Sequence, residues 1–228
     1  MPTPRGGPSS SSGNQINTTL LKDNVQELPS LAALLERFKV TLWSLFFLVP
    51  VGRGQAQQRL TAEEIEVTFE RISRLSDQLP FPVKTTEAPH YRRFLLMHEG
   101  RAAAAKMSTR APLGITDGKG TMFVSHRGDL FPTGFLPIPC GRFPHDSVVS
   151  VYREHPQFVE LRDADRLKGK CRACSYRNLC GGSRARSYAV HGDPLAAEPD
   201  CAYLPPGFEP QQPQHPQLQL PICRAPAG

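Results

Sequence analysis

Four of the six cysteines in this chain lie close together, in the segment CRACSYRNLCGGSRARSYAVHGDPLAAEPDC at residues 171–201. Cys171, Cys174 and Cys180 are spaced C-x2-C-x5-C, and Cys201 follows after twenty more residues. A C-x2-C pair brings two thiolates to the same side of a turn, where both can bind one metal ion or one cluster. The segment therefore predicts a metal centre.

The spacing alone leaves the identity of this centre open between zinc, an iron–sulfur cluster and thiols without a ligand. A structural zinc ribbon usually joins two C-x2-C pairs, and only one is present. An iron–sulfur cube tolerates looser spacing, because its irons occupy separate corners. Gly181 and Gly182 permit close backbone approach, so that N–H groups can reach cluster sulfur atoms.

The first half of the chain predicts strands alternating with helices. Runs rich in β-branched and aromatic residues predict strands at residues 15–20, 40–49 and 81–86. Helices predicted between them imply parallel pairing through crossovers, hence an α/β layer. Because three strands are few for a parallel sheet, we expect them to be part of a larger one.

Two apolar stripes locate the intervening helices. The second helix is predicted to begin at a capping box formed by Thr61 and Glu64. The stripe of the first helix is Leu31, Leu34, Leu35 and Phe38, and that of the second is Ile65, Phe69, Ile72 and Leu79.

The second half has a different character. Turn signals flank the β-prone runs 121–125 and 130–131, which predicts a hairpin. Short helical patterns follow at residues 147–153 and 156–161, and we place a domain boundary near residues 98–113.

Composition excludes several classes of protein. With 228 residues and 39% hydrophobic content the chain can bury a real core. The net charge of +6 is spread along the chain, which argues against nucleic-acid binding. The longest apolar run, residues 40–52, is too short to span a membrane. Residues 1–13 and 205–228 are predicted to be disordered tails, and because no secretory signal is recognised we expect a cytoplasmic protein.

The cysteine segment, with the preceding RDADRLKGK, resembles the C-terminal SPASM domain of radical S-adenosylmethionine (SAM) enzymes, in the subgroup of haem and haem d1 maturases. GITDGKGTMFVSHRGDLFPTGFLP resembles the hairpin of this subgroup, and INTT, LWSLFFLVPVGRG and KTTEAPHYRR resemble later strands of its barrel. The resemblance covers residues 14–204. It implies an α/β fold in which residues 14–97 form part of a (β/α) radical SAM barrel and residues 114–204 form a SPASM domain.

The resemblance also implies a ligand set. In the family, C-x2-C-x5-C and a later cysteine hold one auxiliary 4Fe-4S cluster, which here assigns Cys171, Cys174, Cys180 and Cys201 as ligands. The cluster would transfer electrons or anchor the substrate, a tetrapyrrole or a peptide.

A second auxiliary cluster is expected to be absent, because Thr133 and Arg184 occupy the positions of two of its cysteines. We interpret Cys140 as a small apolar filler and Cys223, in the tail, as an unpaired thiol.

The chain departs from the family in one respect that concerns activity. The C-x3-C-x2-C loop that holds the SAM-cleaving cluster is missing, since no cysteine precedes Cys140. The chain is therefore expected to be inactive alone and to require an N-terminal half or a separate radical SAM subunit, with ferredoxin or flavodoxin as electron donor. The alternative is a non-catalytic iron–sulfur or zinc-binding interaction module that partners such a subunit.

Other polar residues have a functional and a plainer interpretation. Gly52, Arg53 and Gly54 follow a predicted strand, where they form either the edge of a SAM pocket or an ordinary tight turn. His90 and Arg92 either meet an anionic substrate, such as a porphyrin propionate, or are solvated at the surface.

The arginines beside the cysteines are the last candidates. Arg184 and Arg186 either moderate the negative charge of a cluster or form a structural ion pair, with Asp193 or Asp200 as partner. His126 and His191 have no ligand spacing and are interpreted as loop residues.

Overall fold

A parallel sheet of three strands forms the first half of the computed structural model, which describes residues 13–100 and 115–209. The strands are β1 (Gln15–Leu20), β2 (Leu42–Phe47) and β3 (Val83–Thr86), in the order β1-β2-β3. The predicted strands and their parallel pairing are thus confirmed. The boundary expected near residues 98–113 and most of the two expected tails lie outside the described residues.

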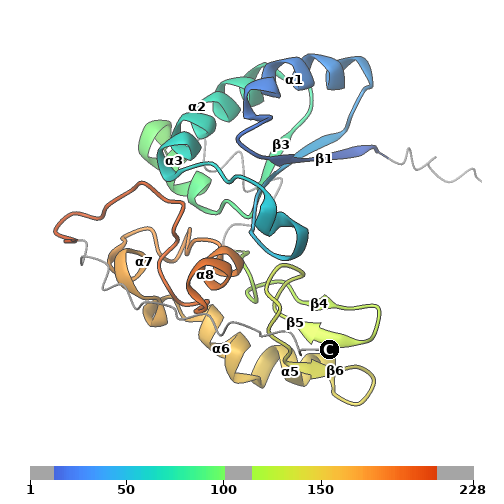
Figure 1. Cartoon of the computed structure of the whole chain (residues 1–228), viewed down its shortest axis with the longest axis vertical. Coiled ribbons are helices and arrows are strands. Elements are labelled where there is room, and N and C mark those ends of the chain that lie inside the picture. The colour runs from blue at the N-terminus through green and yellow to red at the C-terminus, as the bar shows by residue number, and fades with distance from the viewer. Residues whose placement is uncertain (1–12, 101–114, 210–228) are drawn as a thin grey trace, which may run out of the picture.

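Helices pack against this sheet. Figure 1 shows α1 (Leu28–Arg37) and α2 (Ala62–Gln78), the two crossover helices, on one side of the strands, with α3 (His90–His98) beside α2. Trp43 and Phe69 are fully buried between sheet and helices. Burial of such large apolar side chains stabilises this layer.

The predicted stripe of α2 is confirmed at Ile65, Phe69 and Ile72, whereas Leu79 lies just beyond the end of the helix. The predicted stripe of α1 is partly wrong. Leu34 and Phe38 are exposed, and the buried face of α1 is Leu28, Ala32 and Leu35. The helix begins earlier than the leucine pattern suggested, with proline at its start. Leu28, Ala32 and Leu35 are spaced by four and three residues, so they form one face of this longer helix.

The second half contains an antiparallel sheet of short strands and several short helices. β4 (Phe123–Val124) and β5 (Asp129–Phe131) form the predicted hairpin, and β6 (Gly141–Arg142), which was not predicted, pairs with β5. The helices predicted at 147–153 and 156–161 are confirmed as α5 (Val148–Glu154) and α6 (Pro156–Arg162).

α8 (Arg184–His191) was not predicted, and it places His191 at a helix end and not in a loop. Its signals are local: the Ser183 hydroxyl accepts from the Arg186 N–H, and Gly192 ends the helix in the left-handed conformation with φ of 71°. α8 has no apolar stripe, because Arg184 and Arg186 are among its buried residues.

The remaining elements are short: the 3-10 turns η1 (Val25–Glu27), η2 (Gly52–Ala56) and η3 (Ala164–Arg166), and the helix α7 (Gly169–Ala173). No helix in residues 13–100 or 115–209 is long and apolar enough to cross a lipid bilayer.

Candidate metal centre

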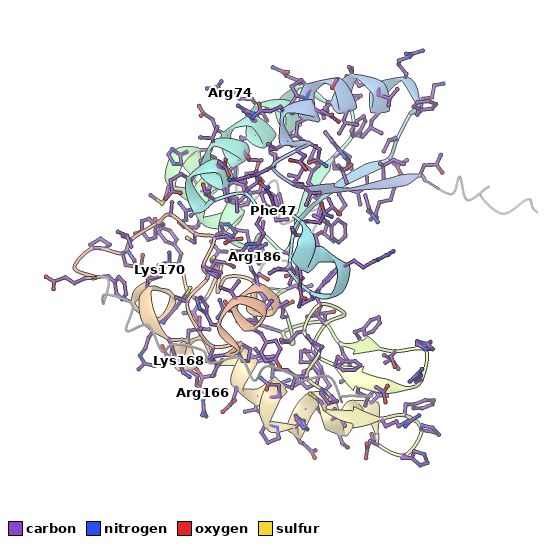
Figure 2. All side chains as sticks on the ribbon, viewed as in Figure 1. Phe47, Arg74, Arg166, Lys168, Lys170 and Arg186 are labelled. Carbon is purple, nitrogen blue, oxygen red and sulfur yellow. The ribbon has the colours of Figure 1, made fainter. Side chains whose placement is uncertain are left out.

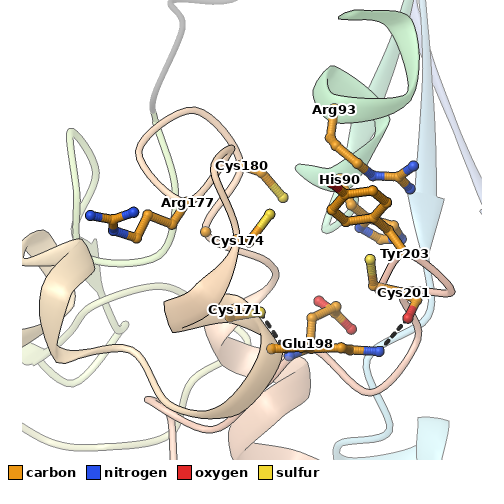
Figure 3. A pocket seen from close by; sticks show the side chains of 11 residues that line it. His90, Arg93, Cys171, Cys174, Arg177, Cys180, Glu198, Cys201 and Tyr203 are labelled. Carbon is orange, nitrogen blue, oxygen red and sulfur yellow. Dashed lines mark hydrogen bonds between the residues drawn. The ribbon is translucent and has the colours of Figure 1, made fainter. Parts of the chain in front are cut away.

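The four clustered cysteines line one cavity, which we call the cysteine cavity. Figure 3 shows the side chains of Cys171, Cys174, Cys180 and Cys201 around it. It contains about 370 Å³ of space not filled by protein atoms, part of it open to solvent. Within the described residues, no group of three or more His, Cys, Asp or Glu side chains forms a site for a single metal ion.

Local backbone structure brings three of these cysteines together. Cys171 lies in α7, and Cys174 is the residue at which that helix ends. The chain then turns back, because the Arg177 N–H donates to the Cys174 carbonyl at 3.1 Å and the Cys180 N–H donates to the Tyr176 carbonyl at 2.8 Å. Cys201 comes from a separate stretch beyond α8, so its position depends on tertiary packing.

Backbone N–H groups approach the sulfur atoms. The Glu198 N–H lies 3.2 Å from Cys171 Sγ, and the Gly182 N–H lies 3.4 Å from Cys180 Sγ. Gly182 has φ of +69°, and a Cβ there would lie 2.8 Å from Glu198 Cβ. Only glycine fits this position, which agrees with the close approach expected from the glycine pair.

Burial raises the pKa of the Cys174 and Cys180 thiols and raises that of Cys201 to about 11. A bound cation must therefore displace protons from these sulfurs, as metal binding to thiolates generally does. Four sulfur donors around one cavity, with N–H groups directed at two of them, fit an iron–sulfur cluster.

A buried ion-pair network lies beside the cavity. Arg186 Nη1 is 3.1 Å from Glu198 Oε1, and Arg186 Nε is 3.1 Å from Asp200 Oδ2. Burial alone would raise the pKa of Glu198, but the charge of Arg186 and further neighbours outweighs it and holds the pKa at about 2. The structural ion pair with Asp200 is therefore present, whereas Asp193 pairs with Lys168 at 2.6 Å.

Arg186 also joins the two halves of the molecule. Its guanidinium donates to the carbonyls of Phe47 at 3.3 Å and Leu48 at 3.1 Å, where β2 ends, and of Glu87 at 2.6 Å, just beyond β3. Figure 2 shows Arg186 near Phe47, between the parallel sheet and the cysteine-rich part. Arg184 instead donates to carbonyls in its own half and lies 4.0 Å from Cys171 Sγ.

A larger cavity opens at the carboxyl end of β3, with about 1080 Å³ of space not filled by protein atoms, part of it open to solvent. Lys84, Glu87, Arg92 and Thr133 are among the residues that line it. Burial, with the nearby charge of Asp117, raises the pKa of Glu87 to about 8.

His90 and Arg92 follow β3 and lie two residues apart on α3, so their side chains face different places. His90 is fully buried and lines the cysteine cavity, so the expectation that it is solvated was wrong. Burial lowers its pKa to about 3. Arg92 is half-buried, lines the larger cavity, and donates to the carbonyls of Leu179 at 3.3 Å and Ile115 at 3.1 Å.

The other candidate residues lie elsewhere. Gly52, Arg53 and Gly54 lie in η2 and line neither cavity, so their assignment to a SAM pocket stays a prediction. Cys140 is buried away from the cysteine cavity, with its Sγ 3.4 Å from the Ile138 carbonyl oxygen, and Cys223 lies outside the described residues.

Sequence reasoning missed Arg93, whose buried guanidinium lines the cysteine cavity. The available signal was its spacing of three residues from His90, which places both on one face of a helix.

Comparison with known proteins shows relatives in sequence and in fold. The chain is 33% identical over 197 residues to the AdoMet-dependent heme synthase of Methanosarcina barkeri, covering 84% of this chain and 56% of that protein. It is 34% identical to the enzyme of that name from Nitratidesulfovibrio vulgaris, covering 84% and 54%. It is 25% identical to the pre-heme d1 synthase of Dinoroseobacter shibae, covering 82% and 50%. The chain thus spans about half the length of these relatives.

A solved structure shares the fold. The crystal structure of Streptococcus suis SuiB matches with a TM-score of 0.58 at 15% identity, covering 84% of this chain and 46% of that one. No protein-family model matches the chain.

Proposed function

This chain belongs to the haem-maturase-like subgroup of radical SAM proteins, and on that premise we propose that it is the cluster-binding portion of a tetrapyrrole-modifying oxidoreductase. In this proposal residues 14–97 are the later part of a radical SAM barrel and residues 114–204 are a SPASM domain. The observation that carries it is the convergence of four cysteines, from two separate stretches of chain, on one cavity.

The cysteine cavity is proposed to hold one auxiliary 4Fe-4S cluster. Its four sulfurs would be the ligands, and such a cluster supplies one-electron transfer when it is bound. The Glu198 and Gly182 N–H groups then donate to ligand sulfurs. Each such N–H favours the reduced, more negative cluster and raises its reduction potential.

The larger cavity is proposed to take the substrate. Ligands of open α/β sheets bind beyond the carboxyl ends of the strands, where this cavity lies. Lys84 and Arg92 line it and offer positive charge to the carboxylates of a tetrapyrrole. The substrate class is drawn from the relatives, whose names are those of haem and Fe-coproporphyrin III synthases.

Cleavage of SAM is not assigned to the residues of this chain, because no cysteine precedes Cys140. We propose that the C-x3-C-x2-C loop is supplied by an N-terminal half or a separate radical SAM subunit, with ferredoxin or flavodoxin as electron donor. If the DNA upstream encodes this loop in frame, both parts belong to one polypeptide. If it does not, that result favours the alternative of a non-catalytic module that partners a separate subunit.

Anaerobic reconstitution tests the cluster. We expect about four irons per chain with matching sulfide, because four cysteine ligands complete one cube. Cys174→Ala should lose most of this iron, whereas Cys140→Ala, a buried cysteine outside the cavity, should retain it. Stoichiometric zinc without sulfide would contradict the proposal and support a zinc module.

A further inference from the structure

Two side chains of α3 line the cysteine cavity and carry buried polar atoms that have no hydrogen-bond partner in the part of the chain that the structure describes. His90 is 0% exposed, and among the described residues neither its Nδ1 nor its Nε2 has a hydrogen-bond partner. The Nε of Arg93 is likewise buried without a partner there. Both residues line the cysteine cavity, and Figure 3 shows them on the side of it near Cys201.

Their surroundings hold both side chains in place. The His90 ring packs on Phe69 of α2, with 4.9 Å between ring centroids. The terminal nitrogens of Arg93 contact Glu66 and the Met97 sulfur. The Arg93 guanidinium lies 5.2 Å from the centre of the Tyr203 ring. The orphaned atoms therefore belong to ordered side chains.

Buried donors without partners are costly, and native proteins rarely keep them. Here two such groups occur on one helix face, at i and i+3, beside four sulfur atoms. A ligand that accepts hydrogen bonds and carries negative charge would satisfy both. An iron–sulfur cluster with four thiolate ligands is such a group.

We propose that His90 and Arg93 donate hydrogen bonds to sulfur atoms of the cluster held in the cysteine cavity and thereby raise its reduction potential. This rests on the proposed cluster and adds to it. The two donors come from the helix after β3, whereas all four ligands come from residues 171–201. The parallel-sheet half of the molecule would thus set the potential of a cluster that the other half binds.

The test compares reconstituted His90→Phe and Arg93→Lys proteins with the unsubstituted chain. Phenylalanine keeps the aromatic contact with Phe69 but has no N–H, and lysine keeps the charge of Arg93 but lacks Nε. We expect both variants to bind the same iron and sulfide and to show a more negative reduction potential in an EPR-monitored titration. His98→Phe is the matched control, because it makes the same change at an exposed position on the same helix outside the cavity. Its potential should be unchanged.

A second measurement detects the contact between histidine and cluster directly. In protein labelled with ¹⁵N-histidine, pulsed EPR of the reduced cluster should show coupling to a histidine nitrogen, and His98→Phe should retain that coupling. His90→Gln, which keeps an N–H donor, should recover part of the potential lost in His90→Phe.

The outcomes separate the two proposals. Failure of the unsubstituted chain to bind iron and sulfide would contradict the cluster itself. A bound cluster without nitrogen coupling would overturn only the assignment of these donors. So would a cluster whose reduction potential in His90→Phe and in Arg93→Lys equals that of the unsubstituted chain.

Discussion

At the scale of single residues, Glu87 is a buried ionisable group that contacts both halves of the molecule. Glu87 has φ of 57°, uncommon for a residue with a side chain, and its carboxylate accepts from the Ser183 hydroxyl at 2.5 Å. Its backbone carbonyl accepts from Arg186. Burial and the charge of Asp117 make ionisation of this carboxyl unfavourable, so its pKa is raised.

Glu87 should make stability depend on pH. Its pKa rises from 4.5 to about 8 on folding, so the folded state holds the proton more tightly than the unfolded state. The resulting stabilisation is complete below pH 4.5 and is lost as the pH rises toward 8. The free energy of unfolding, measured by urea denaturation, should fall as the pH rises from 4.5 to about 8, and Glu87→Gln should make this fall smaller. Glu63→Gln, a change at an exposed position, should keep the original dependence of the free energy of unfolding on pH. If this dependence is the same in all three proteins, the assignment to Glu87 is refuted.

At the scale of elements, a helix can be predicted from the sequence when its capping residues and its apolar period indicate the same segment. In α2 the Thr61 hydroxyl accepts from the Glu64 N–H at 3.2 Å, and the Glu64 carboxylate accepts from the Thr61 N–H at 2.7 Å. This capping box was predicted and is confirmed. α8 has a good cap at Ser183, but its buried arginines hide the apolar period that would identify it.

The capping box yields a stability prediction. Thr61→Ala removes the side-chain acceptor of the Glu64 N–H and should cost about 1 kcal/mol of unfolding free energy in urea denaturation. Thr61→Ser retains a hydroxyl cap and should stay close to the original stability. If the alanine and serine variants are equally stable, the cap does not contribute.

At the scale of the whole molecule, the two halves are connected through polar contacts as well as apolar packing. The second hydrophobic cluster includes Val49, which follows β2, together with residues of the cysteine-rich half such as Leu136 and Ala185. Arg186 is the polar counterpart, since one guanidinium binds two carboxylates of its own half and the strand ends of the other. Its position fixes the cysteine cavity relative to the sheet.

Loss of this arginine should loosen both halves at once. Arg186→Met leaves Glu198 buried without its cationic partner and leaves Asp200 with Arg59 alone, which should cost about 3–5 kcal/mol in chemical denaturation. Amide hydrogen exchange should accelerate in both α8 and the end of β2. Arg74→Met, which removes an exposed pair within α2 (Figure 2), should change neither. Faster exchange confined to α8 would mean that Arg186 does not connect the halves.

The sequence by itself determined the features that depend on neighbouring residues. It was sufficient for the three parallel strands, the capped helix α2, the hairpin and the cysteine spacing, because strand and helix periods and turn residues act over a few positions. It also indicated the family.

Only the tertiary structure decided which distant groups meet. It brought Cys201 to the other three cysteines, turned His90 and Arg93 of α3 toward them, and buried Arg186 between strand ends and carboxylates. No local pattern encodes these contacts, because each depends on how segments distant in the sequence pack together and on where buried charges find partners.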